Sequence, residues 1–372
     1  MARVRVEGLT KRFGSTAVLD GISFTVEDGE LFVLLGPSGC GKSTMLRIIA
    51  GLEEADAGSV LFNERNILGL PSRERNLGMV FQDYWLYPHM TVAENIAYGL
   101  DARGFNRNEI SRRVAEVLDL LSLRGYADSG VTDLSGGEQQ RVGLARAFVK
   151  DADAYLFDEP LSSLDAKLRN QMRQYIMQLH KRTGKATIYV THDQLEAFAL
   201  ADRIAVMQKG RIMQIGTPRD IFDHPQNVFV ARFVGLPPMN LFHCHLGGDT
   251  HEQRLAGLDL SWLCRDADCL RRLRASGQRE FIIGVRPEDF ALADEDPGAG
   301  GDDLQIAGTV KEISELAGEY EIVVTLPSGQ NECVVVLRGS GEWLKKGDRV
   351  SLAAKPRSLH LFDAATEEVL PG

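Results

Sequence analysis

The chain has 372 residues and a mass of 41.0 kDa, more than one hydrophobic core usually holds, which predicts two or three domains. With 44% hydrophobic and 25% charged residues it has a globular composition, and its longest apolar run, residues 31–35, is too short to cross a bilayer. The net charge is −10 and the five cysteines follow no regular spacing, so we expect a cytosolic chain that is neither exported nor held by disulfides.

The first part of the chain alternates short apolar runs with amphipathic stretches. The runs that we expect to be strands are residues 4–9, 30–36, 77–82, 154–159, 187–192 and 203–208. Apolar residues recur at the helical period at Ile110, Val114, Val117, Leu118 and Leu121, and again at Leu168, Met172, Ile176 and Leu179 before a stop at Gly184. The pattern predicts an α/β domain over residues 1–235, with a mostly parallel sheet that buries one apolar face of each helix.

The pattern changes after residue 235. A turn at Pro237 and Pro238 leads into short alternating runs, which predict a small all-β, barrel-like domain over residues 236–372; the expected strands include residues 280–285, 306–313, 321–326 and 349–354. Residues 294–303 are acidic and rich in glycine, and we expect a mobile loop there. This second part carries 14 basic and 23 acidic side chains, a balance that argues against nucleic acid as a partner.

A glycine-rich loop between the run at 30–36 and a helical stretch carries the strongest motif. It has the G-x-x-x-x-G-K-[ST] spacing in which backbone N–H groups, a helix N-terminus and a lysine converge on phosphate oxygens, while a hydroxyl reaches Mg²⁺. A glycine-rich turn that merely caps a helix is the alternative, but the strand before and the helix after favour a loop that binds the phosphates of a nucleotide. We predict that the nucleotide is bound by Gly36, Pro37, Ser38, Gly39, Cys40, Gly41, Lys42, Ser43 and Thr44.

Two acids follow the apolar run that begins at Ala154. Because ligands of open α/β sheets lie beyond the carboxyl ends of the strands, Asp158 is expected beside the bound phosphates as a metal-side carboxylate. Glu159 points differently and can orient or deprotonate the attacking water. Taken alone, Asp-Glu after a strand is commonly a solvated turn; the phosphate loop favours the catalytic interpretation.

Residues 134–140, LSGGEQQ, begin a predicted helix. Ser135 and Glu138 have the spacing of a capping box, but a bare cap needs neither the glycines nor the second glutamine. The heptad closely resembles the signature of the nucleotide-binding subunits of ABC transporters, and it lies in the family's order between the phosphate loop and the second acidic strand. The resemblance implies ATP contacts from Ser135, Gly136, Gly137 and Gln139.

Other positions extend the resemblance. Phe13 is similar to the aromatic residue that stacks on adenine, Gln82 to the glutamine that reaches Mg²⁺ and the water, and His192 to the switch histidine at the γ-phosphate; residues 162–165 resemble the D-loop. The resemblance implies catalytic roles for Glu159, His192, Gln82 and Lys42. It implies Mg²⁺ contacts from Ser43, Gln82 and Asp158.

The family's architecture implies the partners. Two copies dimerise head-to-tail, so that Ser135 and Gly137 act on the nucleotide of the other chain, in a homodimer or a heterodimer with a similar subunit. A helical subdomain is implied at about residues 84–150, and residues 84–96, with Tyr84, Trp85, Leu86 and Tyr87, resemble the loop that receives a transmembrane permease. The chain is then a peripheral protein at the cytoplasmic face of the plasma membrane, and it serves an extracytoplasmic solute-binding protein indirectly.

Segments beyond the ATPase core narrow the branch. Residues 214–242, 284–290 and 360–363 look like the subunits of bacterial importers that carry a C-terminal OB-fold regulatory domain, and the join at residues 237–240 resembles the maltose and glycerol-phosphate type. Polyamine, ferric-iron and sulfate or thiosulfate importers share the same core and remain alternatives. A soluble ABC protein of DNA repair or translation, and a phosphate-loop kinase or GTPase, are disfavoured because the chain has no coiled-coil insertion and no Asn-Lys-x-Asp motif.

Overall fold

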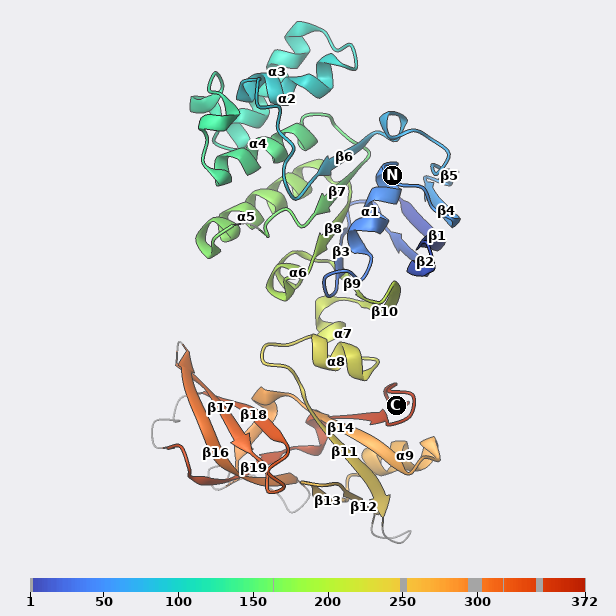
Figure 1. The fold of residues 1–372 in the computed structure, drawn as a ribbon, viewed down its shortest axis with the longest axis vertical. Helices are drawn as coiled ribbons and strands as arrows, with labels where there is room; N and C mark the ends of the chain where they lie inside the picture. The colour runs from blue at the N-terminus through green and yellow to red at the C-terminus, as the bar shows by residue number, and fades with distance from the viewer. Residues whose placement is uncertain are drawn as a thin grey trace. The chain divides into compact units, whose positions relative to one another are not determined.

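The computed structural model describes residues 3–162, 164–247, 253–293, 303–316, 318–338 and 344–371. The chain forms two compact units, Met1–Arg219 and Asp220–Gly372 (Figure 1). The sequence pattern placed the boundary at residue 235. The difference arises because α8 (Val228–Phe233) is bound to the second unit: Val228 N–H donates to the carbonyl of Glu367, and Arg286 donates to the carbonyls of Ala231 and Val234.

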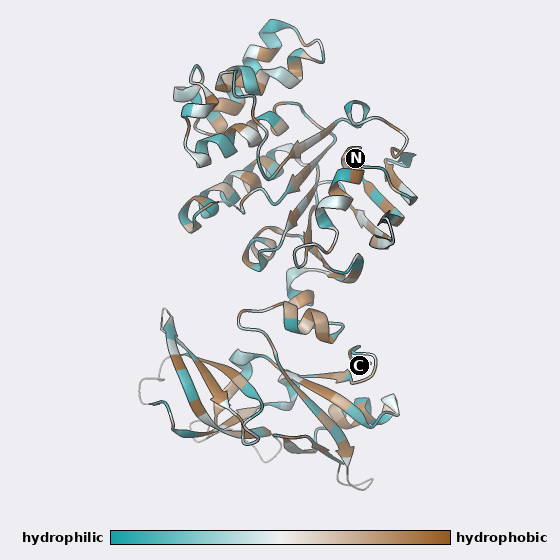
Figure 2. Ribbon diagram, viewed as in Figure 1, coloured by the Kyte–Doolittle hydropathy of each residue, from teal (hydrophilic) through white to brown (hydrophobic). Residues whose placement is uncertain are grey.

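A six-stranded sheet forms the centre of the first unit. Its order is β10-β9-β3-β8-β7-β6. The strands are β3 (Leu31–Leu35), β6 (Leu77–Val80), β7 (Ala154–Asp158), β8 (Ala186–Thr191), β9 (Arg203–Gln208) and β10 (Arg211–Gly216). All neighbours pair in parallel except β9 and β10. Every residue of β3, β7 and β8 is buried, as expected for parallel strands covered on both faces, and Figure 2 shows these strands as hydrophobic.

A second, antiparallel sheet was not anticipated. Its order is β2-β1-β4-β5, and the strands are β1 (Val4–Phe13), β2 (Thr16–Val26), β4 (Ala57–Phe62) and β5 (Arg65–Asn66). The run at residues 4–9 therefore does not join the parallel sheet. The reason is visible in β1, where buried Val4 and Val6 alternate with the more exposed Arg5 and Glu7, because one face of this sheet is solvated. Both sheets share a core with α1 (Lys42–Ala50).

The helices of the first unit fall into two groups (Figure 1). Helices α2 (Val92–Asp101), α3 (Arg107–Leu120) and α4 (Gly136–Phe148) pack on one another, so the apolar face of α3 meets α2 and α4 rather than the sheet, which corrects the expectation for residues 110–121. The second group consists of α5 (Ala166–Thr183) and α6 (Gln194–Leu200), which contact each other. Helix α5 is capped by Gly184, as predicted.

The second unit contains two five-stranded sheets around one core. The orders are β13-β12-β11-β14-β20 and β15-β19-β16-β17-β18. The strands are β11 (Asn240–Gly247), β12 (Gln253–Ala256), β13 (Ser261–Cys264), β14 (Glu280–Val285), β15 (Phe290–Leu292), β16 (Leu304–Leu316), β17 (Glu319–Thr325), β18 (Glu332–Arg338), β19 (Arg349–Ala354) and β20 (Leu359–Asp363).

The expectation of a C-terminal β domain is thus confirmed, and the unit also contains helices α7 (Pro218–Asp223), which spans the boundary, α8 and α9 (Ala267–Ser276). The acidic loop expected at residues 294–303 lies, apart from its last residue, outside the described residues. Among the residues that the structure describes, no helix is long and apolar enough to cross a membrane.

Candidate functional site

The register of the parallel sheet brings the sequence-predicted residues to one edge. Leu35 lies beside Thr191, Asp158 beside Val190, and Val80 beside Phe157. The carboxyl ends of β3, β8, β7 and β6 therefore lie side by side along this edge. The phosphate loop follows β3 and His192 follows β8. Glu159 follows β7, and Gln82 lies just after β6. Residues far apart in the chain converge where an open α/β sheet binds ligands.

The phosphate loop connects β3 to α1 and depends on its glycines. A Cβ on Gly36 would collide with the main-chain oxygen of Met207. Gly41 has a φ of +106°, and a Cβ there would lie 2.6 Å from the oxygen of Val18. Both positions accept only glycine, so the loop can pass close to the neighbouring backbone.

Lys42 is nearly buried, with 4% of its surface exposed. Its Nζ donates to the carbonyl of Gly36 at 2.8 Å and to that of Pro37 at 3.1 Å. The ammonium group thus lies inside the loop that leads to it, while residues 37–39 are exposed. Burial raises the pKa of the Cys40 thiol, although the nearby Lys42 charge acts in the opposite direction.

Ser43 and Asp158 meet across the edge. The Ser43 hydroxyl donates to Asp158 Oδ1 at 2.7 Å. Burial raises the pKa of the Asp158 carboxyl, and the hydrogen bond from Ser43 and the charges of Arg47 and Lys42 oppose that shift. A buried acid of this kind gains from a positive ion placed next to it.

Glu159 and His192 form a pair that the sequence did not predict. Nδ1 of His192 lies 2.8 Å from Glu159 Oε2, and the imidazole is about half exposed while the carboxylate is largely covered. Glu159 has a φ of +45°, in the left-handed region that is strained for a glutamate. Its backbone N–H donates to the carbonyl of Val190, and its carbonyl accepts from the Ser162 hydroxyl at 3.1 Å.

Two further predicted residues are exposed. Gln82 follows β6, which ends at Val80, so Gln82 lies just beyond the strand rather than in it. Phe13 is the last residue of β1, and 51% of its surface is exposed. The Lys11 ammonium lies 4.9 Å from the centre of the Phe13 ring. An exposed aromatic ring with a cation at its face offers a flat surface for stacking.

The signature residues surround the start of α4. The Glu138 carboxylate accepts from both the backbone N–H and the hydroxyl of Ser135, at 2.8 and 2.7 Å, and these bonds lower the pKa of Glu138. Gln139 donates to the carbonyl of Val131. Gly136 is exposed, whereas a Cβ on Gly137 would collide with the Leu168 side chain. The hydrogen bonds of Ser135 and Gln139 thus stay within residues 131–139, and the capped start of α4 is exposed at Ser135 and Gly136.

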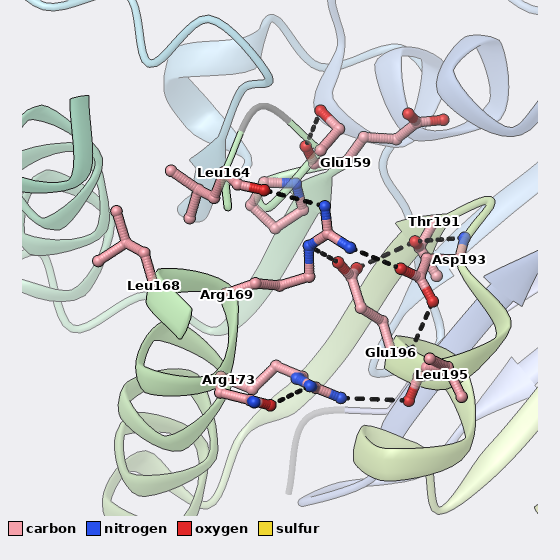
Figure 3. Close-up of polar contacts among 12 residues, drawn as sticks. Glu159, Leu164, Leu168, Arg169, Arg173, Thr191, Asp193, Leu195 and Glu196 are labelled. Atoms are coloured by element: carbon pink, nitrogen blue, oxygen red, sulfur yellow. Dashed lines mark hydrogen bonds and ion pairs between the residues drawn. The ribbon is translucent and has the colours of Figure 1, made fainter. Parts of the chain in front are cut away.

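The segment resembling a D-loop links β7 to α5. Asp165 caps α5 by accepting from the Leu168 N–H at 2.9 Å, and Ser163 lies outside the described residues. The sequence missed the arginine one turn later: Arg169 donates to the carbonyl of Leu164 and to the carboxylate of Asp193 (Figure 3). An arginine on an amphipathic helix gives no signal of such a role.

The predicted aromatic loop lines a groove of about 610 Å³ in the first unit. Tyr84, Trp85 and Tyr87 contribute to it, and the Trp85 ring stacks on Phe81 with 4.3 Å between the ring centres. The sequence missed the basic wall of the groove. Arg146 lies 4.7 Å from the centre of the Tyr87 ring and Lys150 lies nearby, and burial lowers the pKa of both side chains.

The fold and this edge define a phosphate-loop nucleotide-binding protein, and comparisons with known proteins specify its class. Residues 19–162 match the model of the ABC transporter family, and residues 283–362 match that of the TOBE domain. The chain is 43% identical over 369 residues to the sn-glycerol-3-phosphate import ATP-binding protein UgpC of Chromobacterium violaceum, covering 99% of this chain and 96% of that one.

Other relatives agree. The sulfoquinovosyl glycerol transport ATP-binding protein SmoE of Agrobacterium fabrum is 40% identical, with 99% of both chains covered. A solved dimer of the ATP-binding cassette MJ0796 with ADP and Pi has a TM-score of 0.53 and 30% identity, and covers 58% of this chain and 99% of that one. The chain belongs to the family of ATP-binding subunits of ABC transporters. It is an ATP-binding ATPase coupled to transport, as the sequence predicted.

Proposed function

We propose that the chain hydrolyses ATP at the carboxyl edge of the six-stranded sheet, with the residues named from the sequence in their expected roles. Lys42 and the backbone N–H groups of the loop at residues 36–44, other than Pro37, bind the phosphates, and Phe13 stacks on the adenine. The observation that carries this proposal is that the Ser43–Asp158 bond of 2.7 Å and the Glu159–His192 contact of 2.8 Å lie along the edge that holds the phosphate loop.

The oxygen ligands at this edge fit Mg²⁺. Mg²⁺ binds through one or two carboxylates or hydroxyls together with substrate phosphates and waters. Ser43, Asp158 and Gln82 offer such oxygens, and the described residues contain no group of three or more His, Cys, Asp or Glu that could hold a metal by themselves. When bound, Mg²⁺ neutralises charge on the β- and γ-phosphates.

The acid and base chemistry falls to Glu159. Its carboxylate orients the attacking water and accepts its proton, a role that contributes about 10²–10⁴-fold in rate when the group is positioned. His192 donates from Nδ1 to the carboxylate and so fixes its orientation, while its exposed side chain can reach the γ-phosphate. Gln82, from the neighbouring strand end, contacts the same water.

Two chains complete each site. Ser135 and Gly136 are exposed at a helix N-terminus, an arrangement that binds anions, and the backbone N–H and hydroxyl of Ser135 donate to Glu138 of its own chain. These features support a head-to-tail dimer, a homodimer or one with a similar subunit, in which Ser135, Gly136, Gly137 and Gln139 face the γ-phosphate on the partner.

A mixing experiment tests this arrangement. Lys42→Ala removes the phosphate-loop charge, and Ser135→Arg blocks the signature; each variant alone should have almost no ATPase activity. Mixing the two should restore activity, because half of the composite sites in a mixed dimer then combine an intact loop with an intact signature. If the mixture stays as inactive as its components, or if a strictly monomeric preparation turns over at the full rate, the composite site is wrong.

The transport role follows from the groove and the relatives. The aromatic and basic groove around Trp85 and Arg146 offers a surface for a permease segment, which would hold the chain at the cytoplasmic face of the membrane. The names of the relatives support an importer of sugars or glycerol phosphates, fed by a solute-binding protein; polyamine, ferric-iron and sulfate or thiosulfate importers remain the alternatives.

The solute is tested with the assembled complex of permease, ATPase and binding protein. We expect sn-glycerol 3-phosphate or a sugar glycoside to stimulate ATP hydrolysis, while a polyamine, ferric iron and sulfate do not. If only a polyamine, ferric iron or sulfate stimulated ATP hydrolysis, the assignment to a sugar or glycerol-phosphate importer would be wrong.

A further inference from the structure

Arg169 connects the two segments that carry Glu159 and His192. It lies on the first turn of α5, where its Nη2 donates to the carbonyl of Leu164 at 3.0 Å and its Nη1 donates to Asp193 Oδ2 at 3.1 Å. Leu164 belongs to the segment that follows Glu159, and Asp193 directly follows His192. Figure 3 shows the guanidinium between these two segments.

The histidine segment is held on both sides by the same cluster. Glu196, with a side chain only 3% exposed, accepts from the hydroxyls of Tyr189 and Thr191 at 2.9 and 3.0 Å. Asp193 accepts from the Glu196 N–H through Oδ1 and binds Arg169 through Oδ2. The residues before and after His192 therefore have fixed partners, and Arg169 carries the charge that faces both carboxylates.

Arg169 places a positive charge beside the carboxylates of both Asp193 and Glu196. Nε of Arg169 lies 3.7 Å from Glu196 Oε1, and burial raises the pKa of Glu196, an effect that the two hydroxyls and Arg169 oppose. Removing the arginine would leave two partly buried carboxylates facing each other. Because a buried carboxylate without its positive partner is destabilised, the two side chains would move apart or bind a proton.

We propose that Arg169 is a positioning residue for ATP hydrolysis, which holds the segment after Glu159 in register with the segment around His192. The inference rests on the roles proposed above for Glu159 and His192. Arg169 itself touches neither the glutamate nor the histidine. It acts by keeping the 2.8 Å Glu159–His192 contact in place, since a displacement of about 1 Å can reduce turnover by up to about 100-fold.

The experiment compares Arg169→Gln and Arg169→Lys with a matched control, Arg173→Gln, in the full chain. Arg173 lies one turn further on the same helix and donates to the carbonyl of Leu195 on α6 and to Asn170 (Figure 3). It therefore reaches the start of α6, but it does not connect that segment to Leu164 as Arg169 does. We expect Arg169→Gln to lower kcat by about tenfold with KM for ATP within about twofold, and Arg173→Gln to leave both unchanged.

Two further measurements separate positioning from mere stability. Arg169→Lys, which can bind one or two of the three partners, should recover part of kcat, and ATP affinity should be the same in all variants. Asp193→Asn keeps the cap on α6 and removes the ion pair, so it should show the same loss as Arg169→Gln, and the double variant should be no worse than either. If Arg169→Gln does not fold, Asp193→Asn tests the same ion pair on its own.

The outcomes are distinguishable. If Glu159→Gln retains turnover, the proposed catalytic role fails and the inference fails with it. If Glu159→Gln is inactive but Arg169→Gln and Asp193→Asn match Arg173→Gln in kcat, only the inference is overturned. A loss of ATP affinity that accounts for the whole effect would also overturn it, because the arginine would then act on binding.

Discussion

In the first unit, two pairs of charged side chains contact each other at the edge of the six-stranded sheet, whereas in the second unit a buried arginine donates hydrogen bonds to the main chain. Glu159 contacts His192, and Arg169 contacts Asp193. In contrast, Arg286, which is 3% exposed, donates to the carbonyls of Phe222, Ala231 and Val234. Contacts between side chains can rearrange when a ligand arrives; bonds to main-chain carbonyls fix the path of the chain. The comparison predicts effects on turnover in one unit and on stability in the other.

The largest expected effect is at Glu159. Glu159→Gln keeps the shape of the side chain and removes its ability to accept a proton, so kcat should fall by about 100-fold to 10,000-fold while ATP still binds. Binding without turnover should also make closed dimers accumulate, which size-exclusion chromatography with ATP can detect.

The exposed Glu116 of α3 provides the control, because Glu116→Gln changes an equivalent charge far along the chain from this edge. Its turnover should equal that of the unmodified protein. Normal turnover in Glu159→Gln would show that Glu159 is not catalytic. The predicted contrast, with effects on turnover in the first unit and on stability in the second, would then be wrong.

Arg286→Met should show the opposite behaviour. The substitution leaves buried carbonyls without a donor and removes a guanidinium that lies 4.0 Å from the centre of the Phe222 ring, so the free energy of unfolding of the second unit should drop by about 3 kcal/mol. Denaturant unfolding measures this loss, and kcat at low temperature should stay the same.

Arg338→Met serves as its control, since that side chain is 83% exposed and pairs with Glu319 at the surface. Stability there should change by less than about 0.5 kcal/mol. If Arg286→Met lowered kcat while the second unit stayed fully folded, main-chain anchoring would not be the role of Arg286.

The smallest effect is a pH dependence in the second unit. Burial lowers the pKa of His360 from 6.5 to about 4, with the charges of Arg286, His224 and Arg272 acting in the same direction. The unfolded chain binds the proton first as the pH falls, so stability is full above about pH 6.5 and is lost between 6.5 and 4. The loss at His360 should be on the order of 2 kcal/mol.

His360→Gln should flatten this part of the pH profile, measured by urea unfolding at pH 7 and pH 4.5. The exposed His243 supplies the comparison, because His243→Gln should leave the profile unchanged. Equal acid sensitivity with and without His360 would show that other groups cause it.

Local motifs explain how much could be predicted. The phosphate loop, Asp158, the strands of the parallel sheet other than β10, and strands β14, β16, β17 and β19 of the second unit follow from spacing and periodicity, because these signals are contained in a few consecutive residues. The Glu159–His192 and Arg169–Asp193 contacts join segments 33 and 24 residues apart, and no local pattern marks such pairs. The second sheet and the packing of α3 were missed for a related reason: alternation or an apolar face shows that a surface is buried, but not against which neighbour.

The bonds of Lys42 have a consequence for how nucleotide enters. The three N–H donors of its ammonium group point to the carbonyls of Gly36 and Pro37 and, at 3.9 Å, to the Cys40 sulfur, so a phosphate oxygen competes with these acceptors. The loop is therefore held in part by the same side chain that we propose to bind the phosphates. In the proposed binding of ATP, Lys42 exchanges an acceptor within the protein for a phosphate oxygen, so the net gain in binding free energy is smaller than the strength of the new contact alone.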